Sequence, residues 1–308
     1  LSIGVLEMDN KKIKNLHPGD TVQSFFLVKA ADCKITNNNK TYLDLTLVDQ
    51  TGEINAKLWD HNAEEGPQYP PNTLVKIKGI TNEWQNRLQL KIDKIRAATE
   101  EDGLTISDFV PTAPYSPEFM YAEIENYIDK IKNQDMHNIV RSIVTASKEK
   151  LLLYPAAKQN HHAVRSGLMY HIMTMLRMGE KASEVYLDLN RDLLFSGIIL
   201  HDIAKTAEMN ASELGIVSEY TIEGELLGHI IQGIKLIEQT AAMIGADQEV
   251  SLLLQHMILS HHYEPEFGSP KRPMIPEAEL LHYLDMIDAR MYDMGRVLGS
   301  VDEGQLSE

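Results

Sequence analysis

The chain has 308 residues, of which 43% are hydrophobic and 24% are charged, and its formal net charge is −16. This length is enough for two ordinary domains, each with a core of its own. The single cysteine, Cys33, excludes an internal disulfide and a metal site built from several thiolates.

The sequence carries no signal for membrane insertion or secretion. No apolar run reaches the ~18–20 residues that a membrane-spanning helix needs. The N-terminal residues also lack the basic and apolar pattern of a secretory signal. Twelve histidines without a cysteine framework favour a reducing compartment and metal ligation through nitrogen and oxygen. We therefore expect a cytoplasmic protein with no membrane partner.

The acidic charge is concentrated in one part of the chain. Residues 14–98 hold eleven Lys and Arg against ten Asp and Glu, whereas the remaining residues hold eighteen against thirty-five. A strongly acidic surface opposes nucleic-acid binding. That objection does not apply to the nearly neutral N-terminal part.

Residues 14–98 are expected to form β-strands. In residues 42–48, leucines alternate with polar side chains, which is the period of a strand with one buried face. The other expected strands are 22–31, 54–59, 74–80 and 88–95, with the last two joined by a hairpin tip at 83–87. Five short strands predict a small barrel, for which the OB-fold is the leading candidate and an SH3-like barrel the alternative.

The chain changes character after residue 98. Residues 99–117 are expected to be a linker, because an acidic stretch leads into Pro111, Pro114 and Pro117, which discourage regular structure. In residues 118–300, apolar residues recur at spacings of three and four, so this part is predicted to be an all-α bundle. The expected helices lie near 118–133, 135–150, 164–181, 191–204, 222–243, 247–261 and 276–299.

The predicted bundle carries histidines and aspartates on apolar helices. Residues 193–200 are apolar on all sides and end in His201 and Asp202, which are costly to bury unless something binds them. Taken singly, such residues are more often core or capping residues than ligands. Helical bundles, however, build metal sites from inward-facing side chains on several helices. The predicted ligands are His171, His201, Asp202, His229, His261, His262 and Asp285, with Asp288 as the alternative to Asp285.

Imidazole and carboxylate ligands suit Mn²⁺, Fe²⁺, Mg²⁺ or Zn²⁺. Two such ions about 3.5–4 Å apart activate a water and clamp the oxygens of a phosphate. His201, Asp202 and Lys205 are the predicted catalytic residues. Lys205 offers a positive charge to a phosphate, or it is an ordinary residue at a helix end. His161, His162 and Arg165 precede the first ligand helix, where they contact the substrate or form a capping segment.

The predicted barrel offers aromatic and basic side chains for single-stranded nucleic acid. OB-folds bind such strands with a basic groove and stacking aromatics. The candidates are Trp84 and Arg87 at the hairpin tip, together with Tyr42, Trp59 and Lys57. The alternative is that Trp59 belongs to the core, that the lysines are ordinary solvated residues, and that the barrel binds a protein.

The order His171, His201–Asp202, Asp285 resembles the HD superfamily of metal-dependent phosphohydrolases. The string HDIAK at 201–205 departs from the usual HD-[IL]-G-K form only at Ala204. The histidines at 229, 261 and 262 are similar to those of HD subfamilies that hold two metals, in which an aspartate in the place of Asp202 bridges both ions.

The whole chain resembles a more specific family. A barrel, a proline-rich linker, the segment YPAAKQNHHAVRSGLMYH at 154–171 and the segment Ser260–Pro270 are similar to the YhaM family of bacterial 3′→5′ exoribonucleases over residues 5–300. The resemblance implies Mn²⁺-dependent removal of nucleotides from the 3′ end of single-stranded RNA, with some activity on DNA. It is compatible with a homo-oligomer. The alternative is an HD phosphohydrolase of small nucleotides whose barrel serves assembly.

Overall fold

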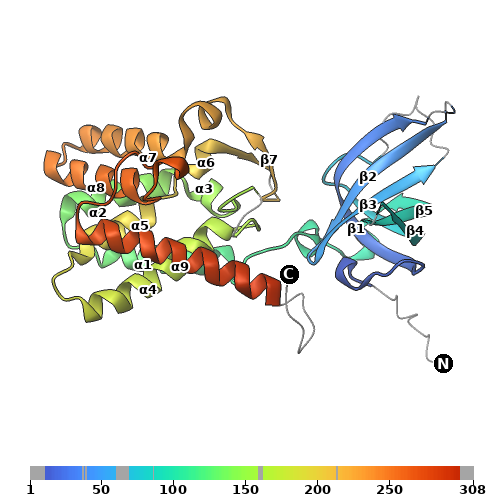
Figure 1. Cartoon of the computed structure of the whole chain (residues 1–308), viewed down its shortest axis with the longest axis horizontal. Helices are drawn as coiled ribbons and strands as arrows, with labels where there is room; N and C mark the ends of the chain where they lie inside the picture. Colours follow the sequence, from blue (N-terminus) through green and yellow to red (C-terminus); the bar gives the residue numbers. More distant parts are fainter. Residues whose placement is uncertain are drawn as a thin grey trace. The chain divides into compact units, whose positions relative to one another are not determined.

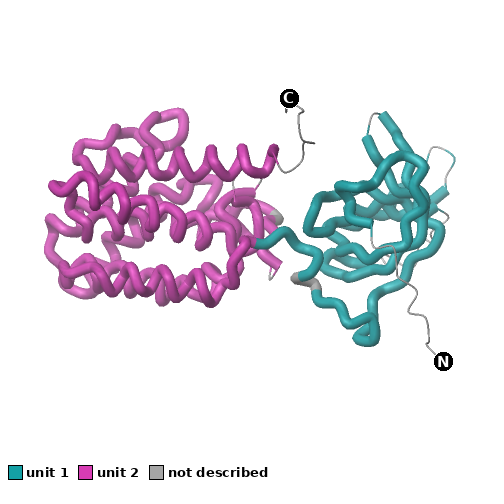
Figure 2. The backbone as a smooth tube through the Cα atoms, turned by 90° about the horizontal axis from the view of Figure 1, so that it is seen from below, with its two compact units in different colours: residues 1–112 teal, residues 113–308 magenta. Residues whose placement is uncertain are grey.

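The structure is a computed structural model, and the chain divides into two compact units, Leu1–Thr112 and Ala113–Glu308 (Figure 2). It describes residues 11–36, 38, 40–59, 69–85, 87–158, 162–212 and 214–298.

The first unit is a closed barrel of five strands (Figure 1). The strands are β1 (Thr21–Ile35), β2 (Thr41–Asp49), β3 (Gly52–Trp59), β4 (Leu74–Trp84) and β5 (Arg87–Ala97). Their order is β1-β2-β3-β5-β4, and β4 pairs with β1 to complete the circle. Only the β3–β5 pairing is parallel, which is the arrangement of an OB-fold. The prediction of an N-terminal all-β barrel is therefore confirmed.

The leucines of β2 show why this segment is a strand. Leu43, Leu45 and Leu47 are all fully buried in the barrel core, and the residues between them point outward. Burial of alternate residues is what a pleated strand with one apolar face requires. The short 3₁₀ helix η1 (Ile13–Asn15) packs beside β3, and two others, η3 (Glu100–Asp102) and η4 (Ile106–Phe109), lie within the predicted linker.

The second unit is a bundle around α5 (Arg191–Leu200) (Figure 1). This helix packs against α2 (Gln134–Ala146), α4 (Gly167–Val185), α8 (Gln248–Ser260) and α9 (Pro276–Leu298). All residues from Leu193 to Leu200 are buried, because this helix is surrounded on every side. None of the described helices is long and apolar enough to cross a membrane. The remaining helices among the described residues are α1 (Pro117–Asp129), α3 (Lys148–Leu151), α6 (Lys205–Glu208), α7 (Ile222–Ile244) and η5 (Pro265–Phe267).

The predicted helical bundle contains one feature that helical periodicity does not indicate. Between α6 and α7, strands β6 (Met209–Ala211) and β7 (Val217–Tyr220) form a two-stranded antiparallel sheet. Strands of three and four residues are too short to show a period of two in the sequence. This sheet leads from the His201–Asp202 segment to the helix that carries His229.

The first residue of α4, Gly167, packs directly against the preceding loop. A Cβ at this position would lie 2.0 Å from the carbonyl oxygen of His162. We expect Gly167→Ala to lower the free energy of unfolding by ~1–3 kcal/mol, because the backbone has to move. Gly295→Ala is the matched control, since nothing lies within 4 Å of its Cβ on helix α9. It should be neutral or stabilising by up to ~1 kcal/mol. Urea unfolding followed by circular dichroism measures both, and equal effects would contradict the prediction.

Candidate metal centre and nucleic-acid interface

Five helical segments bring the predicted ligands to one place in the bundle. His171 lies on α4, His201 and Asp202 follow the end of α5, His261 and His262 follow α8, and Asp285 lies on α9. His229 lies directly after a kink in α7 at Gly228, whose φ of 66° is in the left-handed region. Glycine adopts this conformation without a steric penalty. The break makes His229 the start of a new helical stretch.

The first group of side chains contains His171, His201, Asp202 and Asp285. The Nε2 atom of His171 lies 3.3 Å from Asp285 Oδ1 and 3.2 Å from the Nε2 atom of His201. His201 Nε2 in turn lies 3.4 Å from Asp202 Oδ2. Three of the four, His171, His201 and Asp202, are almost completely buried. Two imidazoles and two carboxylates therefore converge inside the protein.

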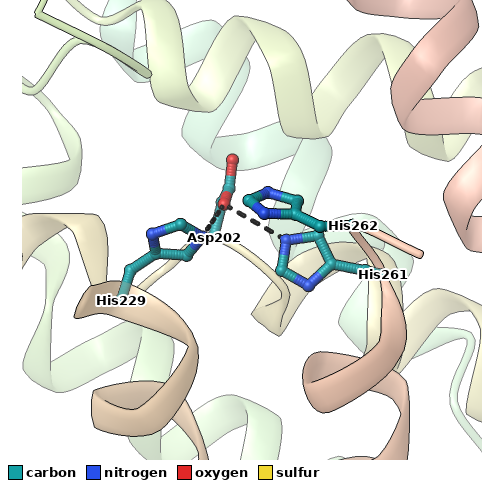
Figure 3. Close-up of side chains that lie close together, drawn as sticks. All are labelled: Asp202, His229, His261 and His262. Carbon is teal, nitrogen blue, oxygen red and sulfur yellow. Dashed lines mark ion pairs between the residues drawn. The ribbon is translucent and has the colours of Figure 1, made fainter. Parts of the chain in front are cut away.

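The second group contains Asp202, His229, His261 and His262 (Figure 3). Asp202 Oδ1 lies 3.3 Å from His229 Nε2 and 3.8 Å from His261 Nε2, and one potential ligand atom from each of the four side chains lies within 4.8 Å of the others. Asp202 therefore belongs to both groups. Its Oδ2 faces the first group and its Oδ1 faces the second.

Every histidine in the two groups has its Nδ1 atom bound to a protein oxygen. This contact holds the ring and leaves Nε2, directed at the group, as the nitrogen that can accept a metal ion. The five contacts are His171 to Asp288 Oδ2 at 2.7 Å, His201 to the Ile198 carbonyl at 2.8 Å, His229 to Glu208 Oε1 at 3.1 Å, His261 to the Ile258 carbonyl at 2.7 Å and His262 to the Phe267 carbonyl at 2.5 Å.

The second group contains buried polar atoms that nothing in the described protein satisfies. Asp202 Oδ1, His229 Nε2 and His261 Nε2 are inaccessible to solvent and have no hydrogen-bond partner among the described residues. Leaving a buried acceptor unpaired is costly, so such atoms call for an explanation such as an ion. The nitrogen and oxygen donors, with no sulfur, fit a divalent cation such as Mn²⁺, Fe²⁺ or Mg²⁺.

The protonation of the two groups differs. Burial lowers the pKa of both His261 and His262, so these rings are neutral and can act as ligands. Burial also lowers the pKa of His171, but the carboxylates of Asp285 and Asp288 outweigh it and raise this pKa to about 9. A cation that binds His171 therefore has to displace a proton.

Lys205 contributes the positive charge of the site. Its Nζ atom donates a hydrogen bond to Asp202 Oδ2 at 2.7 Å. Burial alone would raise the pKa of Asp202, but Lys205 and His201 outweigh it and hold it below its usual range. Burial alone would lower the pKa of Lys205, but the carboxylate of Asp202 outweighs it and keeps this pKa above its ordinary value. Lys205 is the first residue of α6, a helix of four residues, so it also lies in the last turn of that helix.

The structure distinguishes the two aspartates of α9. Asp285 lies on the Nε2 side of the His171 ring, and Asp288 lies on the Nδ1 side. Asp285 can therefore share a metal with His171, whereas Asp288 holds the ring from behind. His261 and His262 do not compete for one position, because both belong to the second group.

The segment before α4 was expected to contact nucleic acid, and its residues are placed differently. His162 is only 1% exposed, and its Nε2 atom lies 2.6 Å from Asp288 Oδ2. A buried ring in this contact does not reach a nucleic acid, which corrects the expectation for His162. Arg165 is half-buried, and its Nε atom has no hydrogen-bond partner in the described part of the chain. His161 lies outside the described residues.

The barrel presents an aromatic and basic cluster on β2 and β3. The rings of Tyr42 and Trp59 have centroids 4.8 Å apart, and Lys57 Nζ lies 5.3 Å from the Tyr42 centroid and 5.8 Å from that of Trp59. Trp59 is 41% exposed, so it is not a core residue. A second place lies where β4 ends and β5 begins. There, Trp84 is paired with Arg87 and is 62% exposed. Both places offer a flat ring and a cation to solvent.

The site also contains Glu208, which no pattern in the sequence predicts. Its Oε1 atom accepts hydrogen bonds from both the backbone N and the Nδ1 of His229, at 2.9 and 3.1 Å. The contact exists only because α7 breaks at Gly228 and because β6 and β7 bring the chain back to α6. A glycine before a histidine was the only sign of this break in the sequence.

Both parts of the chain are similar to known protein families, and the whole chain is similar to known relatives. Residues 168–290 match the HD domain family, and residues 28–98 match the OB-fold nucleic acid binding domain family. The chain is 41% identical over 298 residues to 3'-5' exoribonuclease YhaM of Geobacillus sp. (strain WCH70), covering 97% of this chain and 91% of that one. It is also 41% identical over 290 residues to 3'-5' exoribonuclease YhaM of Bacillus subtilis (strain 168), covering 94% and 91%. The chain therefore belongs to the YhaM family of 3'-5' exoribonucleases.

Proposed function

We propose that this protein is a metal-dependent exonuclease that removes nucleoside monophosphates from the 3′ end of single-stranded RNA, and also of single-stranded DNA. The observation that carries the proposal is the position of Asp202, whose two oxygens face two separate groups of histidines. A carboxylate with this placement can bridge two ions. Two-metal sites are a common solution for hydrolysis of phosphodiester bonds.

The residues present can hold two divalent ions, and we propose that the metal is Mn²⁺. One set of ligands is His171, His201, Asp202 and Asp285, and the other is Asp202, His229, His261 and His262. When bound, the ions lower the pKa of a water and neutralise the charge of the phosphate. Lys205 adds a cation beside Asp202, where it can bind an oxygen of the scissile phosphate.

We assign the binding of the RNA strand to the barrel. The proposed organisation is a strand-holding domain at 14–98, a linker at 99–117 and a catalytic domain at 118–300. Tyr42, Trp59 and Lys57 would stack on and neutralise the RNA strand, with Trp84 and Arg87 as a second contact. Arg165, which is half-buried just before α4 in the catalytic domain, would bind phosphate through its guanidinium group.

The direct test uses single-stranded RNA labelled at its 5′ end, incubated with the protein and Mn²⁺. The expected product is a series of fragments shortened from the 3′ end, and RNA labelled at the 3′ end should release a labelled mononucleotide first. Free nucleoside triphosphates serve as the comparison substrate. An absence of RNA degradation together with hydrolysis of free nucleotides would favour the small-nucleotide phosphohydrolase instead.

Trp59→Ala is expected to weaken the binding of single-stranded RNA. Stacking of a base on an aromatic ring contributes ~1–3 kcal/mol, so the Kd should rise by roughly 5- to 150-fold. Fluorescence anisotropy of labelled RNA, with an inactive variant to prevent cleavage, measures this Kd. The matched control is Tyr186→Ala, because Tyr186 is also an exposed aromatic residue but lies in the helical unit. An unchanged Kd for Trp59→Ala would remove the β2–β3 cluster from the RNA interface.

A further inference from the structure

The five histidines of the metal centre are held at Nδ1 in two different ways. Three of them bind a backbone carbonyl, which is neutral. The other two, His171 and His229, bind a carboxylate from Asp288 and Glu208 respectively. One of these two histidines belongs to each group. Each proposed metal position therefore has a single ligand backed by a negative charge.

Two buried imidazoles hold Asp288, and both contact the same oxygen atom. Its Oδ2 atom lies 2.7 Å from His171 Nδ1 and 2.6 Å from His162 Nε2. The ring of His162 packs against that of Tyr292, with centroids 4.0 Å apart. This contact is held by an unusual backbone, because His162 has a φ of 53°. A non-glycine residue keeps such a conformation only where its surroundings enforce it, and such residues cluster at functional sites.

Glu208 is fixed in the same manner in the second group. Its Oε1 atom accepts hydrogen bonds from the backbone N of His229 at 2.9 Å and from Nδ1 of the same residue at 3.1 Å. The chain reaches this position because Gly224 permits close approach. A Cβ on Gly224 would lie 2.1 Å from the carbonyl oxygen of Glu208. The carboxylate therefore sets both the kinked backbone and the ring of His229.

A carboxylate behind a ligand histidine has a defined physical effect. It fixes the tautomer with the proton on Nδ1, orients the ring and makes Nε2 a stronger donor to a metal. A backbone carbonyl fixes the ring in the same way but brings no net charge. Loss of a carboxylate of this kind typically lowers metal affinity by about 10- to 100-fold.

We propose that Asp288 and Glu208 are positioning residues that set the affinity of the two metal positions separately, Asp288 through His171 and Glu208 through His229. The inference rests on the two-metal centre of the proposed function. It assigns His162 the task of holding Asp288 in place, behind the metal ligands and away from the substrate.

The test is titration calorimetry with Mn²⁺ alone, on protein freed of metal by a chelator. The variants are Asp288→Asn and Glu208→Gln, which remove the charge and keep the shape. We expect each to weaken one of two Mn²⁺-binding steps by about 10- to 100-fold and to leave the other nearly unchanged. The double variant should weaken both steps. If the two single variants affected the same step, the double variant would keep one normal step, and the separate assignment would be wrong.

Glu277→Gln is the matched control. Glu277 is also a buried carboxylate, in the first turn of α9, but it accepts a hydrogen bond from the backbone N of Asn190 and not from a ligand histidine. The Glu277→Gln variant should bind both Mn²⁺ ions with the same affinities as the unaltered protein. Unchanged affinities in Asp288→Asn and Glu208→Gln would overturn the proposal, as would equal losses in all three variants.

His162→Gln gives a second test of the Asp288 arm. This variant removes the imidazole that holds Asp288 and leaves Asp288 itself in place. The Mn²⁺-binding step that Asp288→Asn weakens should therefore also be weakened in His162→Gln, but by less than about 10-fold. Thermal unfolding of each metal-free variant identifies a protein that has failed to fold. The metal-binding result is independent of RNA cleavage. Normal two-step binding in a protein that degrades no RNA would refute the proposed function and leave this proposal standing.

Discussion

Asp202→Asn is expected to reduce the rate of 3′-terminal RNA hydrolysis by at least about 10³-fold. Asp202 is the one side chain shared by both ligand groups, so its loss disturbs both metal positions. Metal ions contribute several kcal/mol of charge stabilisation to such reactions, and about 4 kcal/mol corresponds to a factor of about 10³ in rate. Single-turnover cleavage of 5′-labelled RNA in the presence of Mn²⁺ measures the change directly.

A matched aspartate lies at the opposite end of the same helix. Asp192 in the first turn of α5 accepts hydrogen bonds from the backbone N atoms of Lys132 and Asn133, and it contacts none of the ligand histidines. Asp192→Asn should retain nearly the full rate. Cleavage by Asp202→Asn at a rate within 10-fold of the unaltered protein would show that the reaction takes place elsewhere.

Addition of Mn²⁺ to metal-free protein is expected to raise the Tm of the helical unit by about 10–20 °C. An ion at 100 times its Kd stabilises the folded state by ~2.7 kcal/mol, so two ions give roughly 5 kcal/mol. In a unit of this size, 1 kcal/mol corresponds to about 2–4 °C. The ions would stabilise the fold by binding to Asp202 Oδ1, His229 Nε2 and His261 Nε2, which are buried without a hydrogen-bond partner among the described residues.

The barrel provides an internal control for this experiment. Both tryptophans, Trp59 and Trp84, lie in the barrel, so tryptophan fluorescence follows its unfolding. Far-ultraviolet circular dichroism at the helical minimum follows the second unit. Mn²⁺ should shift the second transition and leave the first unchanged, and Asp202→Asn should remove most of the shift. If no divalent cation changed the helical transition, the metal centre would be absent.

The fold of this protein was predictable to a large extent from local patterns. The alternation of leucines in β2 and the uniformly apolar segment Leu193–Leu200 each specify one kind of element, because burial on one face and burial on all faces leave different periods. The break at Gly228 and the strands β6 and β7 were not predictable in this way. The kink depends on the contact between His229 and Glu208, which lie 21 residues apart in the sequence, and the two strands are too short to show a period of two.

The sequence by itself determined that the chain holds a β-barrel followed by a helical bundle, and which histidines and aspartates could bind metal. These conclusions follow from composition, period and residue chemistry. Only the tertiary structure decided how the ligands divide into two groups, that Asp202 faces both, and that Asp288 and His162 lie behind His171. The physical reason is that such roles depend on which atom of a ring or carboxylate faces the site. That orientation arises when five separate helical segments pack together.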